Sequence, residues 1–139
     1  MAITQALCNS FKQELLQGLH DLDGHTLKMA LFTSSATLGA TTTAYSTTNE
    51  SSGTGYTAGG ATLANVAVSL SGTTAFVDFD NVSFTSATIS DAAGALIYNS
   101  SNSNKAIAVL DFGGDFTVAG GTFKITLPAA GTTAIIRIA

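Results

Sequence analysis

Two histidines and two aspartates lie close together in the sequence, at His20, Asp21, Asp23 and His25. Imidazole and carboxylate groups bind zinc and similar ions, so this spacing could form a metal site. The two aspartates also resemble the start of an EF-hand loop, but the later oxygen donors of such a loop are missing. We favour the simpler interpretation of a solvated helix end followed by a turn, because Asp residues readily form turns.

Four further carboxylates form two pairs, Asp78 with Asp80 and Asp111 with Asp115. Side chains two residues apart in a strand share a face, and a glycine pair between the second two predicts a turn. Such pairs could act as the acid and nucleophile of a glycosidase, or bind calcium at the rim of a β-sandwich. A glycosidase cleft usually has aromatic platforms, however, and the chain contains no Trp. We therefore interpret the four carboxylates as solvated groups beside turns.

The nucleophiles in the sequence lack the partners that catalysis needs. Cys8, the single cysteine, falls within a helical pattern, which favours a packed thiol and excludes an intramolecular disulfide. No Gly-x-Ser-x-Gly motif is present. The glycine pairs at 59–60, 113–114 and 120–121 do not have the spacing of a phosphate-binding loop, and we expect them to be hairpin turns. The sequence therefore predicts a protein that is not an enzyme, with no catalytic residues, no cofactor and no metal.

Composition limits the partners that the chain could bind. With 139 residues it has the size of one domain, predicted over 1–139. Charged residues make up 10%, the net charge is −4, and the five basic residues are scattered, which argues against nucleic acid. No segment approaches 18 apolar residues, so we expect no membrane span. The first residues do not resemble a signal peptide, so we expect synthesis in a cytoplasm.

One amphipathic helix is predicted near the start of the chain. Apolar residues recur there at three- and four-residue steps, the spacing of one helical face. We expect the helix to cover about 3–22, with Thr4 as its N-cap and Gly24 as its stop. The apolar stripe consists of Ile3, Leu7, Phe11, Leu15, Leu19 and Leu22.

After Gly24 the apolar residues alternate with a period of two, which is typical of β-strands. About eight short strands are separated by Gly, Asn and Ser, and no second helical pattern occurs, so parallel βαβ units are excluded. We therefore predict an antiparallel, jelly-roll-like β-sandwich over about 26–139. The expected strands lie near 27–31, 64–70, 75–79, 82–85, 95–98, 107–110, 122–127 and 136–138.

A long segment over about 33–60 interrupts this pattern. It has almost no large apolar side chains besides Leu38, Tyr45 and Tyr56, and its only charged residue is Glu50. Loops of this length are usually functional or disordered, and a nearly uncharged one can lie flat on a neighbouring subunit. We therefore predict that this loop and the apolar helix face bind a partner. The candidate interface residues are Phe11, Leu15, Leu38, Tyr45, Glu50 and Tyr56.

The chain resembles a family of small proteins encoded with the structural genes of tailed bacteriophages and prophages. The resemblance runs from Phe11 to the end of the chain and includes FKQELLQGLHDL, LKMALFTSSATLGATTTAYSTTNE, GTGYTAGGATL and ALIYNSSNSNKAIAVLDFGGD. It implies a virion component made in the host cytoplasm. The small size and predicted sandwich favour a head decoration (cement) protein, which would bind the major capsid protein on the capsid exterior. The resemblance supplies no catalytic motif.

Two other roles stay open at this point: a tail, neck or fibre-adaptor component, and a glycan-binding module on the virion surface. About half of the chain is Ala, Thr, Ser and Gly. A surface made of these small residues carries little charge to oppose self-association. We therefore expect a homodimer or homotrimer as well as binding to other subunits, with apolar and backbone contacts contributing more than charge.

Overall fold

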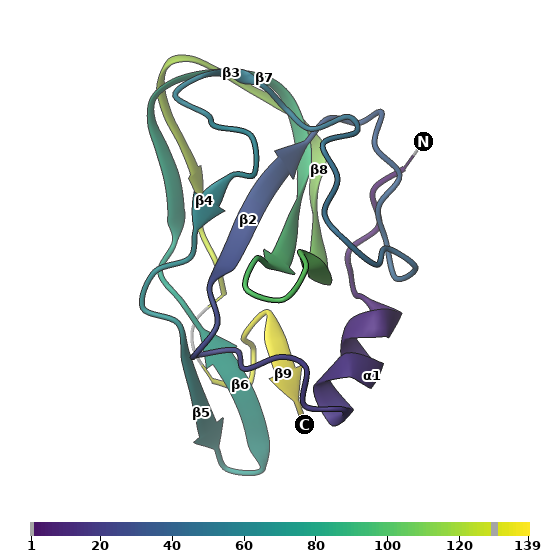
Figure 1. The fold of residues 1–139 in the computed structure, drawn as a ribbon. Helices are drawn as coiled ribbons and strands as arrows, with labels where there is room; N and C mark the ends of the chain where they lie inside the picture. Colours follow the sequence, from purple (N-terminus) through teal and green to yellow (C-terminus); the bar gives the residue numbers. More distant parts are fainter. Residues whose placement is uncertain (1, 129–130) are drawn as a thin grey trace.

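The computed structural model describes residues 2–128 and 131–139. They form two antiparallel β-sheets in a sandwich-like arrangement with one helix (Figure 1), which confirms the predicted mainly β fold. The jelly-roll connectivity stays a prediction. The elements are β1 (Ala6–Leu7), α1 (Asn9–Leu16), β2 (Leu27–Phe32), β3 (Gly53–Thr54), β4 (Ala61–Thr62), β5 (Ala67–Ser71), β6 (Thr74–Asp78), β7 (Val82–Asn99), β8 (Lys105–Ile125) and β9 (Ile136–Ile138).

The larger sheet has the strand order β1-β8-β7-β2-β4, and β3 pairs with the first half of β7. The smaller sheet has the order β5-β6-β9. β2 and the second half of β7 are buried at nearly every position, as expected for central strands covered on both faces. The core therefore lies around these two strands, and both β5 and β9 are edge strands of the smaller sheet.

The two longest strands, β7 and β8, form one ribbon that arches over the top of the molecule in Figure 1. The prediction of two short strands in place of each of them is wrong. Gly113 and Gly120 adopt positive φ, at 78° and 65°, and the pairing register shifts along the same part of the ribbon. The glycine pairs at 113–114 and 120–121 are therefore not hairpin turns but irregular positions inside β8, where bulges let a strand bend without ending.

The helix is shorter than predicted, because it covers Asn9–Leu16 and not 3–22. Gly18, just after the C-cap Gln17, has a left-handed φ of 77°, and the Gly18 and Leu19 amides donate to the carbonyls of Leu15 and Glu14. A glycine in this conformation terminates a helix, so Gly18 provides the stop that we had assigned to Gly24. Cys8, not Thr4, is the N-cap, and its side chain makes no capping hydrogen bond.

The first residues of the predicted helix are extended. Ala6 and Leu7 pair with Val109 and Ala108 of β8, and Ile3 forms a bridge with Leu38. An apolar residue at every fourth position can be buried in an extended chain as well as in a helix. Here the backbone of Ala6 and Leu7 forms its hydrogen bonds with the edge of β8 and not within a helix.

Several predicted strands are confirmed. β2, β5, β6 and β9 lie at or near the expected positions, and β5 and β6 form the predicted hairpin around Gly72. The segment 33–60 contains the two-residue strand β3 and otherwise has no named helix or strand. No helix in the described part of the chain combines the length and hydropathy needed to span a membrane.

Candidate functional site

The two histidines meet at the end of β7. The fully buried Asn99 amide donates to Nδ1 of His20 at 3.0 Å and of His25 at 2.9 Å, and its carbonyl oxygen accepts from the Ser101 amide, which fixes its orientation. His20 Nε2 lies 3.0 Å from a Glu14 carboxylate oxygen. The His20 ring is thus buried, and only the aspartates fit the predicted solvated turn. This cluster joins the α1–β2 connection to the ribbon.

Three of the aspartates accept hydrogen bonds that hold local turns or connect neighbouring segments. Asp21 accepts from the Gly24 amide, Asp80 from the Asn65 side chain at 2.7 Å, and Asp111 from the Gly113 amide at 2.9 Å. Asp111 and Asp115 both lie within β8 and not on either side of a hairpin turn. Among residues 2–128 and 131–139, no group of three or more His, Cys, Asp or Glu side chains is arranged to hold a metal ion.

Cys8 is fully buried at the N-terminus of α1. Burial, together with the nearby charge of Glu14, raises the pKa of the Cys8 thiol to about 11. Its Sγ lies 3.9 Å from the carbonyl oxygen of Gly39. The thiol therefore stays protonated at neutral pH and packs as a small apolar group.

All three tyrosines of the chain gather around Glu50 and form what we term the Tyr–Glu50 cluster (Tyr45, Glu50, Tyr56, Gly59 and Tyr98). The Tyr45 and Tyr56 hydroxyls donate to the Glu50 carboxylate at 2.6 Å and 2.5 Å, and the Gly59 amide donates to it at 2.8 Å. Tyr98 donates to the Gly59 carbonyl and stacks on Tyr45, with ring centroids 4.5 Å apart.

The cluster fastens segment 33–60 to the larger sheet. The Tyr56 hydroxyl also accepts from the Leu31 amide of β2, and Tyr98 belongs to β7. Burial raises the pKa of each tyrosine above its ordinary value, to about 12 for Tyr98, and the Glu50 charge acts in the same direction. Segment 33–60, which was predicted to lie flat on a neighbouring subunit, is thus held against the larger sheet of the same chain by internal contacts, with Glu50 at their centre.

The raised pKa values predict a steep loss of stability in alkali. A tyrosine with a raised pKa in the folded state contributes stability that is fully present below its unfolded value of 10.0 and is lost as the pH rises through the folded value. Cys8 acts with the same sign from its unfolded value of 9.0. We expect urea midpoints to fall as the pH rises from 9 to 12, and phenolate absorbance to appear together with unfolding.

The Tyr98→Phe variant provides the control for this alkaline transition. This variant lacks one of the tyrosine protons that unfolding releases at high pH, so its stability should depend less steeply on pH above 10.0. Phenolate absorbance that rises near the ordinary tyrosine pKa while the protein stays folded would contradict the prediction.

The candidate interface residues are distributed over two regions. Phe11 is only 1% exposed and Tyr56 is also buried, so in this structure neither side chain offers its surface to a partner. Leu15, Leu38, Tyr45 and Glu50 are partly buried, and Tyr45 and Glu50 face each other. Partner contacts through this set stay a prediction.

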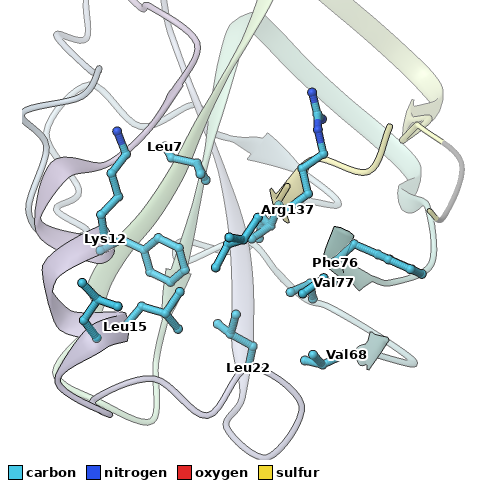
Figure 2. Close-up of a pocket in the computed structure, with 13 residues that line it drawn as sticks. Leu7, Lys12, Leu15, Leu22, Val68, Phe76, Val77 and Arg137 are labelled. Carbon is cyan, nitrogen blue, oxygen red and sulfur yellow. The ribbon is translucent and has the colours of Figure 1, made fainter. Parts of the chain in front are cut away.

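An apolar groove separates α1 from the smaller sheet, and we term it the α1–β9 groove (Figure 2). Its volume is about 360 Å³, within the usual range for binding pockets. One wall is the helix, the other is formed by the three strands of the smaller sheet, and no Asp or Glu lies among the lining residues. These are Leu7, Phe11, Lys12, Leu15, Leu16, Leu22, Val68, Ala75, Phe76, Val77, Ile136, Arg137 and Ile138.

The strand register explains why the sheet wall is apolar. Val68 of β5 pairs with Val77 of β6, which pairs with Ile136 of β9, so the three side chains share one face. The next row on the same face is Leu70, Ala75 and Ile138. In the first row Val77 and Ile136 are buried, whereas in the second row Leu70 and Ile138 are exposed to solvent.

Large apolar side chains are exposed on both walls or beside them. Leu16 of α1 is 90% exposed, Leu70 is 70%, Ile138 is 59% and Val68 is 47%. None of these four residues is among the candidate interface residues predicted from the sequence. For Leu16 the sequence does contain a signal of exposure. This leucine falls outside the apolar stripe of the predicted helix, so its side chain would not reach the core.

A second hollow, of about 450 Å³, lies inside the bend of β8. Phe112 packs near both Phe116 and Phe123, whose ring centroids lie 6.4 and 6.0 Å away. Threonines share the lining of this hollow, whereas the α1–β9 groove is almost wholly apolar apart from two basic residues. We therefore treat the α1–β9 groove as the candidate functional site. Comparisons with protein-family models, with curated proteins and with solved structures found no match to this chain.

Proposed function

We propose that this protein is a non-enzymatic structural subunit of a tailed-bacteriophage virion. In this proposal it is a head decoration protein that binds the major capsid protein lattice on the capsid exterior. The sequence resemblance supports the assignment to a virion, and the α1–β9 groove supports binding to other protein subunits. The groove carries most weight, because contiguous exposed apolar surface on a small protein marks an interaction site.

The low charge of the chain supports binding through surface burial. Only 14 of the 139 residues are charged, so few ion pairs are available for an interface. A single groove of this size gives modest affinity, but many copies on a regular lattice gain avidity from fixed geometry. The proposal includes self-association into a dimer or trimer, to be measured by sedimentation, because the outer edge of β5 in the smaller sheet has no strand partner in the described residues.

The decisive experiment is imaging of purified virions at a resolution that traces each chain. Density for this chain on the capsid lattice, in hundreds of copies, is the expected result. Density in six or twelve copies at the neck or tail would instead identify the protein as a connector component, and complete absence from virions would overturn the proposal.

A salt series tests the mode of attachment. Protein released from heads should still rebind at about 1 M salt as it does at about 0.1 M, because a shorter screening length weakens only the Coulomb contribution and leaves the apolar contacts in place. Rebinding is measured by cosedimentation with stripped heads. The Leu16→Ser variant should rebind more weakly at both concentrations, since it removes an exposed apolar side chain. Loss of wild-type rebinding at 1 M salt would show that charge controls attachment.

A further inference from the structure

β9 has an unpaired edge beside the α1–β9 groove. Within the described residues it pairs only with β6, so the backbone donors and acceptors on its other side have no strand partner. All three of its residues line the groove, although their side chains alternate between faces. The groove therefore runs along the β9 edge, and Figure 1 shows β9 as the strand of the smaller sheet next to α1.

An extended peptide would satisfy this edge, whereas an alkyl chain would not. Edge strands recruit an additional strand through main-chain hydrogen bonds, with alternate side chains entering pockets. On the groove side those pockets are bounded by Ile136 and Ile138 on the sheet and by Leu15 and Leu16 on the helix. The occupant should thus be a β-strand with apolar residues at alternate positions.

Two cations lie beside the groove in a protein whose net charge is −4. Lys12 extends from α1 and Arg137 from β9, and Figure 2 shows their nitrogen-bearing ends directed the same way, on either side of Leu7. Neither forms an ion pair with another described residue; Arg137 donates to the Ala134 carbonyl at 2.6 Å. Two unneutralised cations at one end of an apolar groove complement a carboxylate.

We propose that the α1–β9 groove binds an extended segment of a partner subunit, which adds to β9 as a further strand. The segment carries apolar residues at alternate positions and an Asp or Glu side chain beside Lys12 and Arg137. This inference rests on the proposed function in taking the partner to be another virion protein, but its chemistry is defined by the groove alone.

The test uses synthetic peptides and the full chain. The probe is an acetylated, amidated nine-residue peptide of alternating Val and Thr with one Glu near its end, and its matched control has Lys in place of Glu. Binding is followed by amide chemical shifts. We expect shifts centred on β9 and α1, and affinity for the Glu peptide about ten-fold or more above that for the Lys peptide.

Charge reversal and backbone methylation make the test specific. The Lys12→Glu/Arg137→Glu variant should reverse the peptide preference, while Lys124→Glu, at an exposed position on β8, should leave it unchanged. N-methylation of the peptide amides that face β9 should abolish binding, whereas methylation of the amides that face away should not. Unchanged binding after methylation of the amides that face β9 would overturn strand addition.

Other occupants give distinct results. If laurate displaces the peptide and binds more tightly, the groove is a site for amphipathic small molecules and the proposal fails. If the protein sediments as an oligomer that Lys12→Glu/Arg137→Glu dissociates, a second copy occupies the groove and the proposal also fails. Because virion imaging is independent of these measurements, a protein found on capsids whose groove variants attach normally would overturn this inference and leave the proposed function intact.

Discussion

The Phe11→Ala variant should lose about 3–5 kcal/mol of unfolding free energy, the cost of emptying a fully buried aromatic site. Phe11 is 1% exposed and is the only buried residue of α1, and its ring meets that of His20 edge-on with centroids 5.1 Å apart. A domain is stable by only about 5–15 kcal/mol, so this single change removes a large fraction of the total. Urea denaturation measures it directly.

Leu16→Ala is the matched control on the same helix. Leu16 is the most exposed large apolar residue among those that the structure describes, so its truncation should change stability by less than about 0.5 kcal/mol in the isolated protein. If both variants unfolded at the same urea concentration, α1 would not be anchored through Phe11.

Glu50→Ala should destabilise the protein by about 3 kcal/mol, because it leaves two tyrosine hydroxyls and the Gly59 amide without their charged acceptor. The effect should be concentrated in segment 33–60, which the Tyr–Glu50 cluster fastens to β2 and β7. Amide hydrogen exchange should therefore accelerate there more than in the centre of β7.

A double-mutant cycle with Tyr56→Phe isolates the interaction. The two losses should add to more than the loss in the double variant, because both remove the same hydrogen bond. Glu50→Gln, which keeps the volume and one acceptor oxygen, should cost less than Glu50→Ala. An unchanged exchange rate in segment 33–60 after Glu50→Ala would show that the cluster does not hold the loop.

Local patterns in the sequence predicted much of the fold. Alternation of apolar residues located β2, the β5–β6 hairpin and β9, because each is a short strand with distinct faces. It failed for β7 and β8, since positive φ at Gly113 and Gly120 produces the same glycine signal inside a bent strand as at a turn. The helix was overextended because apolar spacing alone does not distinguish Leu7 in a strand from Leu7 on a helix.

The candidate site was less accessible from the sequence. Phe11 and Leu15 were placed on the correct helix, but the opposite wall of the groove comes from β5, β6 and β9, and 57 residues separate Asp78 from Ile136. Nothing local indicates that these segments pair. Likewise, the Tyr–Glu50 cluster is joined to β7 by Tyr98, which lies 48 positions after Glu50 in the chain.

The pairing of β6 with β9 across the whole β7–β8 ribbon also sets the order of assembly during synthesis. β6 leaves the ribosome before the ribbon and β9 after it, at about 5–20 residues per second. Closing so long an intervening segment costs chain entropy unless the ribbon has already folded into a compact hairpin. One wall of the α1–β9 groove is thus completed last, and a nascent or truncated chain that lacks β9 does not yet possess the surface with which it would engage a neighbour.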